Sequence, residues 1–195
     1  MTASAQIIAY AKIAQQVYNE PPQFGAANGP ARARLYGNVL AFRGTDDFAS
    51  IIADANIDTT PVWGLGRLHK GFWEALAGIL PGLLTIQIQP AVIVGHSEGA
   101  ALASLYAGVL CMMGWHSVSV YGFEPPRMCA DNTLLQLFVT HSVFRFYSSN
   151  GSDPVTEVPP ELSLPGELTH IGSPRGIIPD IEDHYIDNVI RSLEA

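Results

Sequence analysis

The chain has 195 residues, of which 48% are hydrophobic and 14% are charged, and its 18 acidic and 10 basic side chains give a formal net charge of −8. This length and apolar content suit one ordinary domain over residues 1–195 and exclude a disordered protein. Lys12 and Lys70 are the only lysines of the sequence, and no run of basic residues could neutralise a phosphate backbone, so nucleic acid is not expected as a partner.

Hydrophobic periodicity predicts an alternation of helices and strands along the chain. The first helix is expected over residues 7–17, because Pro21 and Pro22 stop it, and the first strand over residues 35–42. The later elements expected are a helix at 72–84, a strand at 91–94, a helix at 99–113, a strand at 118–123, a helix at 132–140, a strand at 143–147 and a helix at 181–193. This order predicts an α/β fold with a mostly parallel sheet, which binds ligands at the carboxyl ends of its strands.

Residues 75–97 and 99–123 contain no charged side chain, but Pro and Gly residues divide each into a helix-length and a strand-length piece, so no transmembrane segment is expected. Residues 1–18 lack the basic start and apolar run of a signal peptide, which predicts a cytoplasmic protein or release without a conventional signal peptide. Cys111 and Cys129 lie in no Cys/His cluster, so neither a disulfide nor a metal site is expected.

The segment Gly95-His96-Ser97-Glu98-Gly99 lies between a predicted strand and a predicted helix. This is the context in which a GxSxG motif projects a nucleophilic serine from a tight turn, so Ser97 is the predicted nucleophile. The helix N-terminus directs backbone N–H groups at the oxyanion formed during attack on a carbonyl, and the N–H of Glu98 is the predicted donor. The alternative is a glycine-serine turn that arose by chance.

An acidic residue and then a histidine should follow this serine, each in a loop after a later strand. Asp153 follows the strand predicted at 143–147 and can orient the histidine, although an Asp-Pro turn explains the same residue. Asp131 and Asp180 are the other candidates.

Two histidines, His170 and His184, follow Asp153 in the chain. His184 is preferred because it opens the last predicted helix after a long loop, although a solvated surface histidine would look the same. Its predicted role is to take the proton of Ser97 as general base and then to protonate the leaving alcohol.

Five segments together resemble the class 3 lipases, the fungal-type triacylglycerol lipases of the α/β-hydrolase superfamily. They are Ala-Phe-Arg-Gly-Thr at 41–45, Leu-His-Lys-Gly-Phe at 68–72, the region 95–103, Pro-Arg at 126–127 and Asp-Pro-Val at 153–155. The resemblance implies an α/β-hydrolase fold, with helices on both faces of the sheet. It also implies that Thr45 completes the oxyanion hole through its N–H and hydroxyl groups, and that Asp46 to Ala55 form a short lid able to contact a lipid interface transiently.

Two positions depart from the pattern of the family. Glu98 replaces the usual apolar residue of the motif, and Glu124 stands at a usual glycine, so both bring acidic groups near the expected site. For Glu98, we prefer a carboxylate stabilised by a helix N-terminus over a group that polarises the acyl pocket.

These observations predict a lipase or esterase that uses no metal or cofactor and forms an acyl-enzyme on Ser97. The acidic balance favours neutral ester or lipid substrates over anionic ones. One alternative is a phospholipase or another acyl-ester hydrolase with the same three residues. The other is a catalytically silent lipid-binding or interaction protein on the same fold.

Overall fold

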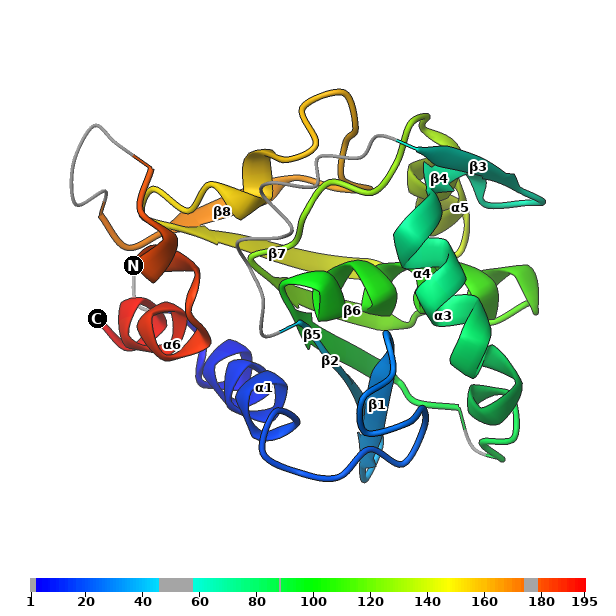
Figure 1. The fold of residues 1–195 in the computed structure, drawn as a ribbon, viewed down its shortest axis with the longest axis horizontal. Coiled ribbons are helices and arrows are strands. Elements are labelled where there is room, and N and C mark those ends of the chain that lie inside the picture. Colours follow the sequence, from blue (N-terminus) through cyan, green and yellow to red (C-terminus); the bar gives the residue numbers. More distant parts are fainter. Residues whose placement is uncertain (1–2, 46–57, 88, 174–178) are drawn as a thin grey trace.

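A computed structural model describes residues 3–45, 58–87, 89–173 and 179–195. A six-stranded sheet runs through it in the spatial order β1-β2-β5-β6-β7-β8 (Figure 1). The strands are β1 (Arg32–Tyr36), β2 (Val39–Arg43), β5 (Val92–His96), β6 (Ser119–Phe123), β7 (Phe144–Asn150) and β8 (Leu168–Ile171). Strand β1 is antiparallel to β2 and every other neighbouring pair is parallel, which confirms the mostly parallel sheet.

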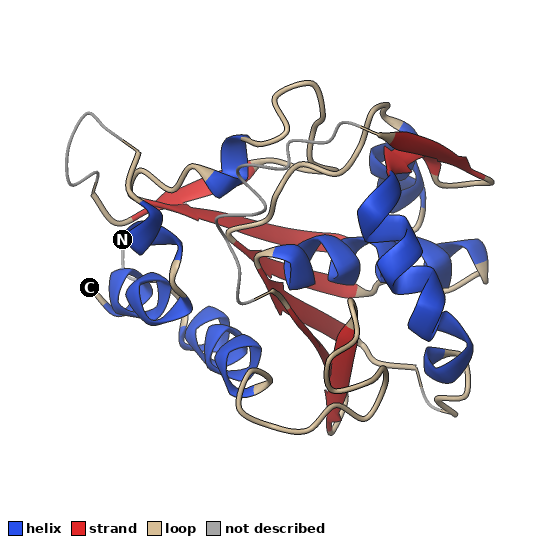
Figure 2. Ribbon diagram, in the orientation of Figure 1, coloured by secondary structure: helices blue, strands red, loops and turns tan. Residues whose placement is uncertain are grey.

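Helices cover both faces of this sheet (Figure 2). One layer contains α1 (Ala5–Gln16) and α6 (Ile186–Glu194), and the other contains α3 (Lys70–Leu83), α4 (Glu98–Met112) and α5 (Thr133–Thr140). Because successive residues of a strand point to opposite faces, Ala41 and Val94 pack toward α1 and α6, whereas Leu40 and Ile93 pack toward α3 and α4. Within the described ranges, no helix has the length and apolar character needed to cross a membrane.

The first predicted strand, at residues 35–42, is wrong as a single element. Tyr36 pairs with Val39 across a two-residue turn, so this region is a hairpin that joins the end of β1 to β2. Gly37 has a φ angle of 61°, the left-handed conformation that such tight hairpin turns need and that glycine adopts without strain.

Other elements also differ from the expected ones. The last helix begins at Ile186, and the 3-10 helix η2 (Ile181–His184) precedes it. The hairpin of β3 (Thr59–Val62) and β4 (Gly66–His69), the 3-10 helix η1 (Val155–Glu157) and strand β8 were not predicted. The expected lid, Asp46 to Ala55, lies outside the described residues.

Candidate active site

Ser97 occupies a strained turn between the end of β5 and the start of α4, as its sequence context predicts. Its φ and ψ angles are 57° and −133°, and its N–H donates to the carbonyl oxygen of Phe123 over 2.9 Å. A β-carbon on Gly95 would lie 2.1 Å from the carbonyl oxygen of Gly99, so only glycine fits beneath the turn. The Ser97 Oγ atom is buried and forms no hydrogen bond within the described part of the chain.

The end of β2 lies against this turn. A β-carbon on Gly99 would lie 2.4 Å from the carbonyl oxygen of Phe42, and one on Gly44 would lie 3.2 Å from the Ser97 β-carbon. Thr45 therefore follows a backbone segment in contact with the turn, while Glu98 is the first residue of α4. Both predicted oxyanion donors thus belong to segments that meet at Ser97.

Asp153 and His184 meet although 31 positions separate them in the chain. The Nδ1 atom of His184 lies 2.8 Å from Oδ2 of Asp153, and both side chains are fully buried. The second carboxylate oxygen of Asp153 accepts a hydrogen bond from the backbone N–H of Val155 over 2.9 Å. Both oxygens therefore have partners, which fixes the plane of the carboxylate and, through it, the orientation of the imidazole ring.

The alternative acids and the alternative histidine have other positions. Asp131 accepts hydrogen bonds from the backbone N–H groups of Arg67 and Thr133, so it holds a loop near β4. Asp180 accepts from the N–H of Glu182 and caps η2. His170 lies on β8 with an exposed side chain. Only Asp153 and His184, of the candidates weighed, form a buried acid-histidine pair in the structure.

His96 connects the serine turn to His184, and the sequence analysis missed this role. Its Nε2 lies 2.7 Å from the carbonyl oxygen of His184 and its Nδ1 lies 2.9 Å from the hydroxyl of Tyr18. A carbonyl oxygen can only accept, so Nε2 carries the proton and Nδ1 accepts from Tyr18. Burial, with His184 nearby, holds the pKa of His96 well below its usual value of 6.5, so its ring is neutral.

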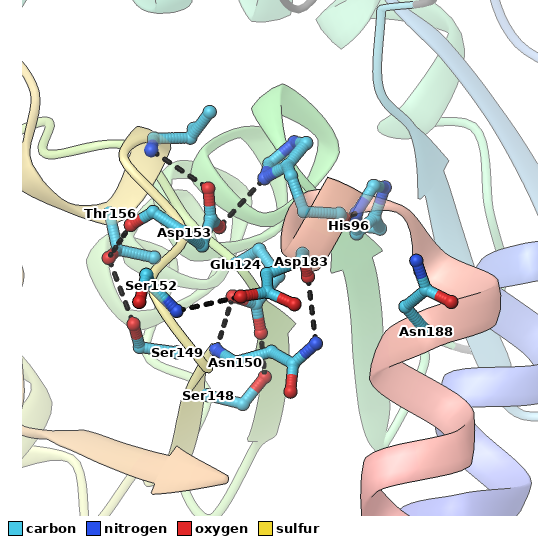
Figure 3. Close-up of polar contacts among 12 residues, drawn as sticks. His96, Glu124, Ser148, Ser149, Asn150, Ser152, Asp153, Thr156, Asp183 and Asn188 are labelled. Atoms are coloured by element: carbon cyan, nitrogen blue, oxygen red, sulfur yellow. Dashed lines mark hydrogen bonds and ion pairs between the residues drawn. The ribbon is translucent and has the colours of Figure 1, made fainter. Parts of the chain in front are cut away.

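Glu124 follows β6 directly and is completely buried. Its carboxyl oxygens accept hydrogen bonds from the Ser148 hydroxyl over 2.8 Å and from the Asn150 N–H over 2.7 Å. Burial, reinforced by the negative charge of Asp153, raises the pKa of Glu124 well above its usual value of 4.5. Figure 3 shows Glu124, Ser148, Asn150 and Asp153 gathered around the C-terminal end of β7.

Burial also dominates at Glu98, where it raises the pKa of the carboxyl group to about 7. Desolvation therefore outweighs the favourable helix N-terminus at this carboxyl group. Among the described residues, no cluster of three or more His, Cys, Asp or Glu side chains is arranged to hold a metal ion.

Together, the contacts place a strained serine turn and a buried acid-histidine pair at the carboxyl edge of one sheet. A serine held in this conformation, with an imidazole oriented by a carboxylate nearby, has the components needed to attack a carbonyl group. The bridge from His96 to His184 brings the nucleophile loop and the histidine loop together. This chemistry is that of acyl transfer.

Comparison with known proteins points to one family. The sequence model of the family described as Lipase (class 3) matches residues 39–163. Two curated relatives, from Penicillium cyclopium and Penicillium camembertii, are both named secreted mono- and diacylglycerol lipase A, and each is 34% identical to this chain over 131 residues. The match covers 62% of this chain and 42% of each relative, so the chain spans less than half the length of the curated relatives it matches.

These relatives contradict the expected cytoplasmic location, or release without a conventional signal peptide, because their names describe secreted proteins. That expectation depends only on the composition of residues 1–18. The match covers only 42% of each relative's length. The composition of residues 1–18 is therefore not enough to decide the compartment.

Solved structures show the same architecture. A lipase from Rhizopus microsporus var. chinensis superposes with a TM-score of 0.67 at 21% identity, covering 83% of this chain and 72% of that one. A mutant of the Penicillium cyclopium protein MDLA superposes with a TM-score of 0.61 at 22% identity, covering 91% and 81%. The fold is therefore the α/β-hydrolase fold, as expected. Since the family's sequence model also matches well over half of the chain, the chain belongs to the class 3 lipase family.

Proposed function

We propose that the chain is a carboxylic ester hydrolase that cleaves lipid esters through an acyl-enzyme on Ser97. The observation that carries the proposal is the buried hydrogen bond of 2.8 Å between His184 and Asp153, held against the Ser97 turn by His96. A buried carboxylate that orients a histidine has the role of the third member of a serine-histidine-acid triad.

In this mechanism, His184 accepts the Ser97 proton at Nε2, since its Nδ1 faces Asp153. The serine oxygen attacks the ester carbonyl, and the negative charge of Asp153 stabilises the imidazolium that results. The backbone N–H groups of Glu98 and Thr45, with the hydroxyl of Thr45, bind the oxyanion. The imidazolium then protonates the leaving alcohol, and water, activated by the same histidine, hydrolyses the acyl-enzyme.

Neutral lipid esters are the proposed substrates. The formal net charge of −8 disfavours anionic substrates and surfaces. Mono- and diacylglycerols, which the names of the two relatives give as their substrates, are neutral esters of this class. Hydrolysis rates that rise when strongly anionic lipid is added to substrate vesicles would argue against this preference.

The first test measures initial rates on nitrophenyl esters from acetate to palmitate, for the wild-type chain and for Ser97→Ala in the same buffer. We expect hydrolysis that Ser97→Ala reduces by several orders of magnitude, as about 10⁴-fold or more is usual for loss of a triad nucleophile. Asp153→Asn and His184→Ala should also lose activity, whereas Asp131→Asn and His170→Ala serve as matched controls that keep it. Equal rates for the wild type and Ser97→Ala would refute the proposal.

The two alternatives make different predictions in the same material. A phospholipase would use the same residues but prefer phospholipids over acylglycerols, so substrate choice alone separates it. A silent lipid-binding protein would form no covalent adduct with a serine-reactive phosphonate. We expect an adduct at Ser97, because its Oγ lies in a strained turn that His96 joins to the oriented histidine.

We also propose that residues 1–195 fold as one domain. Hydrophobic clusters cover both faces of a single sheet, and α6 packs with α1 although they lie near opposite ends of the sequence. A domain of this kind should unfold in one cooperative transition, with coincident curves by circular dichroism and fluorescence. Two separated transitions would contradict the proposal.

A further inference from the structure

Two segments carry the acid-histidine pair, and further hydrogen bonds join these segments to each other. The acid loop, residues 150–153, begins at the end of β7, and the histidine loop, residues 180–184, includes η2. The Nδ2 atom of Asn150 donates to the carbonyl oxygen of Asp183 over 2.8 Å. The backbone N–H of Ser152 donates to Oδ2 of Asp183 over 2.9 Å. Figure 3 shows both hydrogen bonds as dashed lines that meet at Asp183.

The two side chains that make these contacts are buried. Asn150 and Asp183 each expose only 2% of their surface. A β-carbon on Gly151 would lie 2.3 Å from Oδ2 of Asp183, so the carboxylate can come this close to the acid loop only because residue 151 is a glycine. Protein interiors are closely packed, so a side chain held at this range has little freedom to move. The contact therefore defines the spacing of the two loops.

On the histidine side, the contacts fix the backbone on both sides of His184. Asp183 directly precedes His184, so the hydrogen bond from Asn150 holds the peptide group that joins these two residues. The hydrogen bond from Nε2 of His96 holds the next carbonyl oxygen, that of His184 itself, over 2.7 Å. With both neighbouring peptide groups held, the Cα–Cβ bond that carries the imidazole ring has a fixed direction.

On the acid side, the same arrangement fixes the residue before Asp153. Both backbone groups of Ser152 bond to the histidine loop, since its N–H donates to Asp183 and its carbonyl oxygen accepts from the N–H of Asp180 over 3.1 Å. The N–H of Asp153 donates to the carbonyl oxygen of Asn150 over 3.0 Å. The histidine loop therefore holds the backbone from which the Asp153 carboxylate extends.

We propose that Asp183 and Asn150 are positioning residues, which set the relative placement of Asp153 and His184 by holding the acid loop and the histidine loop together. This inference rests on the proposed function. Each of the two acts through the backbone of a neighbouring residue, Asp183 through Ser152 and Asn150 through the peptide group before His184. Placement matters for the rate because a shift of about 1 Å at a reacting group can cost about 100-fold.

Four variants test the proposal. Asp183→Ala removes the acceptor for the Ser152 N–H, whereas Asp183→Asn keeps an acceptor oxygen on a side chain of the same size. Asn150→Ala removes the donor to the carbonyl oxygen of Asp183. Asp131→Ala is the matched control, because this carboxylate also accepts a backbone N–H from a distant segment, that of Arg67, but it holds a loop near β4.

The measurements are kcat and KM for a nitrophenyl ester, the thermal midpoint, and the downfield proton NMR signal of the His184 Nδ1–H. We expect Asp183→Ala and Asn150→Ala to lose about tenfold to 100-fold in kcat with KM changed by less than about twofold, and to shift the NMR signal. Asp183→Asn should keep kcat within about threefold of the wild type and retain the signal. Asp131→Ala should lower the thermal midpoint but keep the wild-type kcat and signal.

Two results would overturn the inference: a kcat in Asp183→Ala no lower than in Asp131→Ala, or a kcat as low in Asp183→Asn as in Asp183→Ala. If Asp183→Ala does not fold, Asn150→Ala takes its place in the first comparison. Failure of the proposed function is a different result, since it appears as wild-type hydrolysis that Ser97→Ala leaves unchanged. In that case the NMR signal, which needs no activity, decides the inference, and a signal unaltered in both alanine variants of the two loops would reject it.

Discussion

Replacing Gly99 by alanine tests whether the close approach of β2 to the serine turn matters for catalysis. The added β-carbon would lie 2.4 Å from the carbonyl oxygen of Phe42 and 2.9 Å from the backbone nitrogen of Gly44. Ordinary contact begins at 3.4 Å, so the end of β2 must retreat by about 1 Å. Phe42 cannot move easily, because it is paired with Gly95 in the sheet.

Two effects should follow for Gly99→Ala. Overpacking should lower the free energy of unfolding by about 1–3 kcal/mol, measured by urea denaturation. Displacement of Thr45, which follows Gly44 directly, should lower kcat by about 100-fold, since a misplacement of about 1 Å is enough for such a loss.

Gly78→Ala is the matched control for this variant. Gly78 is an exposed residue of α3, and a β-carbon there would have no neighbour within 4 Å. The substitution should raise the free energy of unfolding by about 0.5–1 kcal/mol, because alanine restricts the unfolded chain and favours helix, and it should leave kcat unchanged. If Gly99→Ala matched Gly78→Ala in both stability and kcat, the reasoning from close backbone contact would be refuted.

Three further predictions concern stability and are checked by urea denaturation. Because the pKa of His96 lies well below 6.5, the unfolded chain binds a proton below pH 6.5 and the native state does not. The free energy of unfolding should therefore fall by about 1.4 kcal/mol for each pH unit below 6.5. His96→Gln should flatten that slope. Tyr18→Phe removes the donor to a buried ring nitrogen and should cost about 1–3 kcal/mol at neutral pH; a change near zero would contradict the assigned tautomer. Phe138→Ala should lower the free energy of unfolding by about 3–5 kcal/mol, because the ring is fully buried. Trp63→Ala, at a residue 89% exposed, should change it by no more than about 0.5 kcal/mol. Similar losses for both variants would contradict the assigned core.

The parts of the fold that could be predicted from the sequence depend on local signals. The run of apolar residues before Gly95 and the helical spacing after Gly99 predicted a strand, a turn and a helix, and the structure has them at these positions. The order serine, acid, histidine narrowed the search to a few residues, and Asp153 and His184 do meet. These predictions worked because the determining residues are neighbours in sequence or follow a fixed order in the chain.

The missed features depend on contacts that no short segment encodes. Strand β8 pairs with β7 at an edge of the sheet, and its four residues are too few for a clear alternation. The hydrogen bonds of Glu124 go to residues 24 and 26 positions away, so its burial has no local signature. The hairpin at Tyr36 to Val39 is different, because Gly37-Asn38 is a turn signal that sequence reasoning can use.

The hydrogen bonds of His96 have a consequence for folding kinetics. The one to Tyr18 spans 78 positions of the chain, and the one to His184 spans 88. Contacts between residues so far apart form slowly, because closing a long loop costs entropy before any interaction repays it. Helices such as α4 form from local contacts, whereas the serine turn and the acid-histidine pair come together only after both ends of the chain have docked. During refolding, helical circular dichroism should therefore recover before reactivity with a serine-directed phosphonate, which makes that reactivity a probe of the last step of folding.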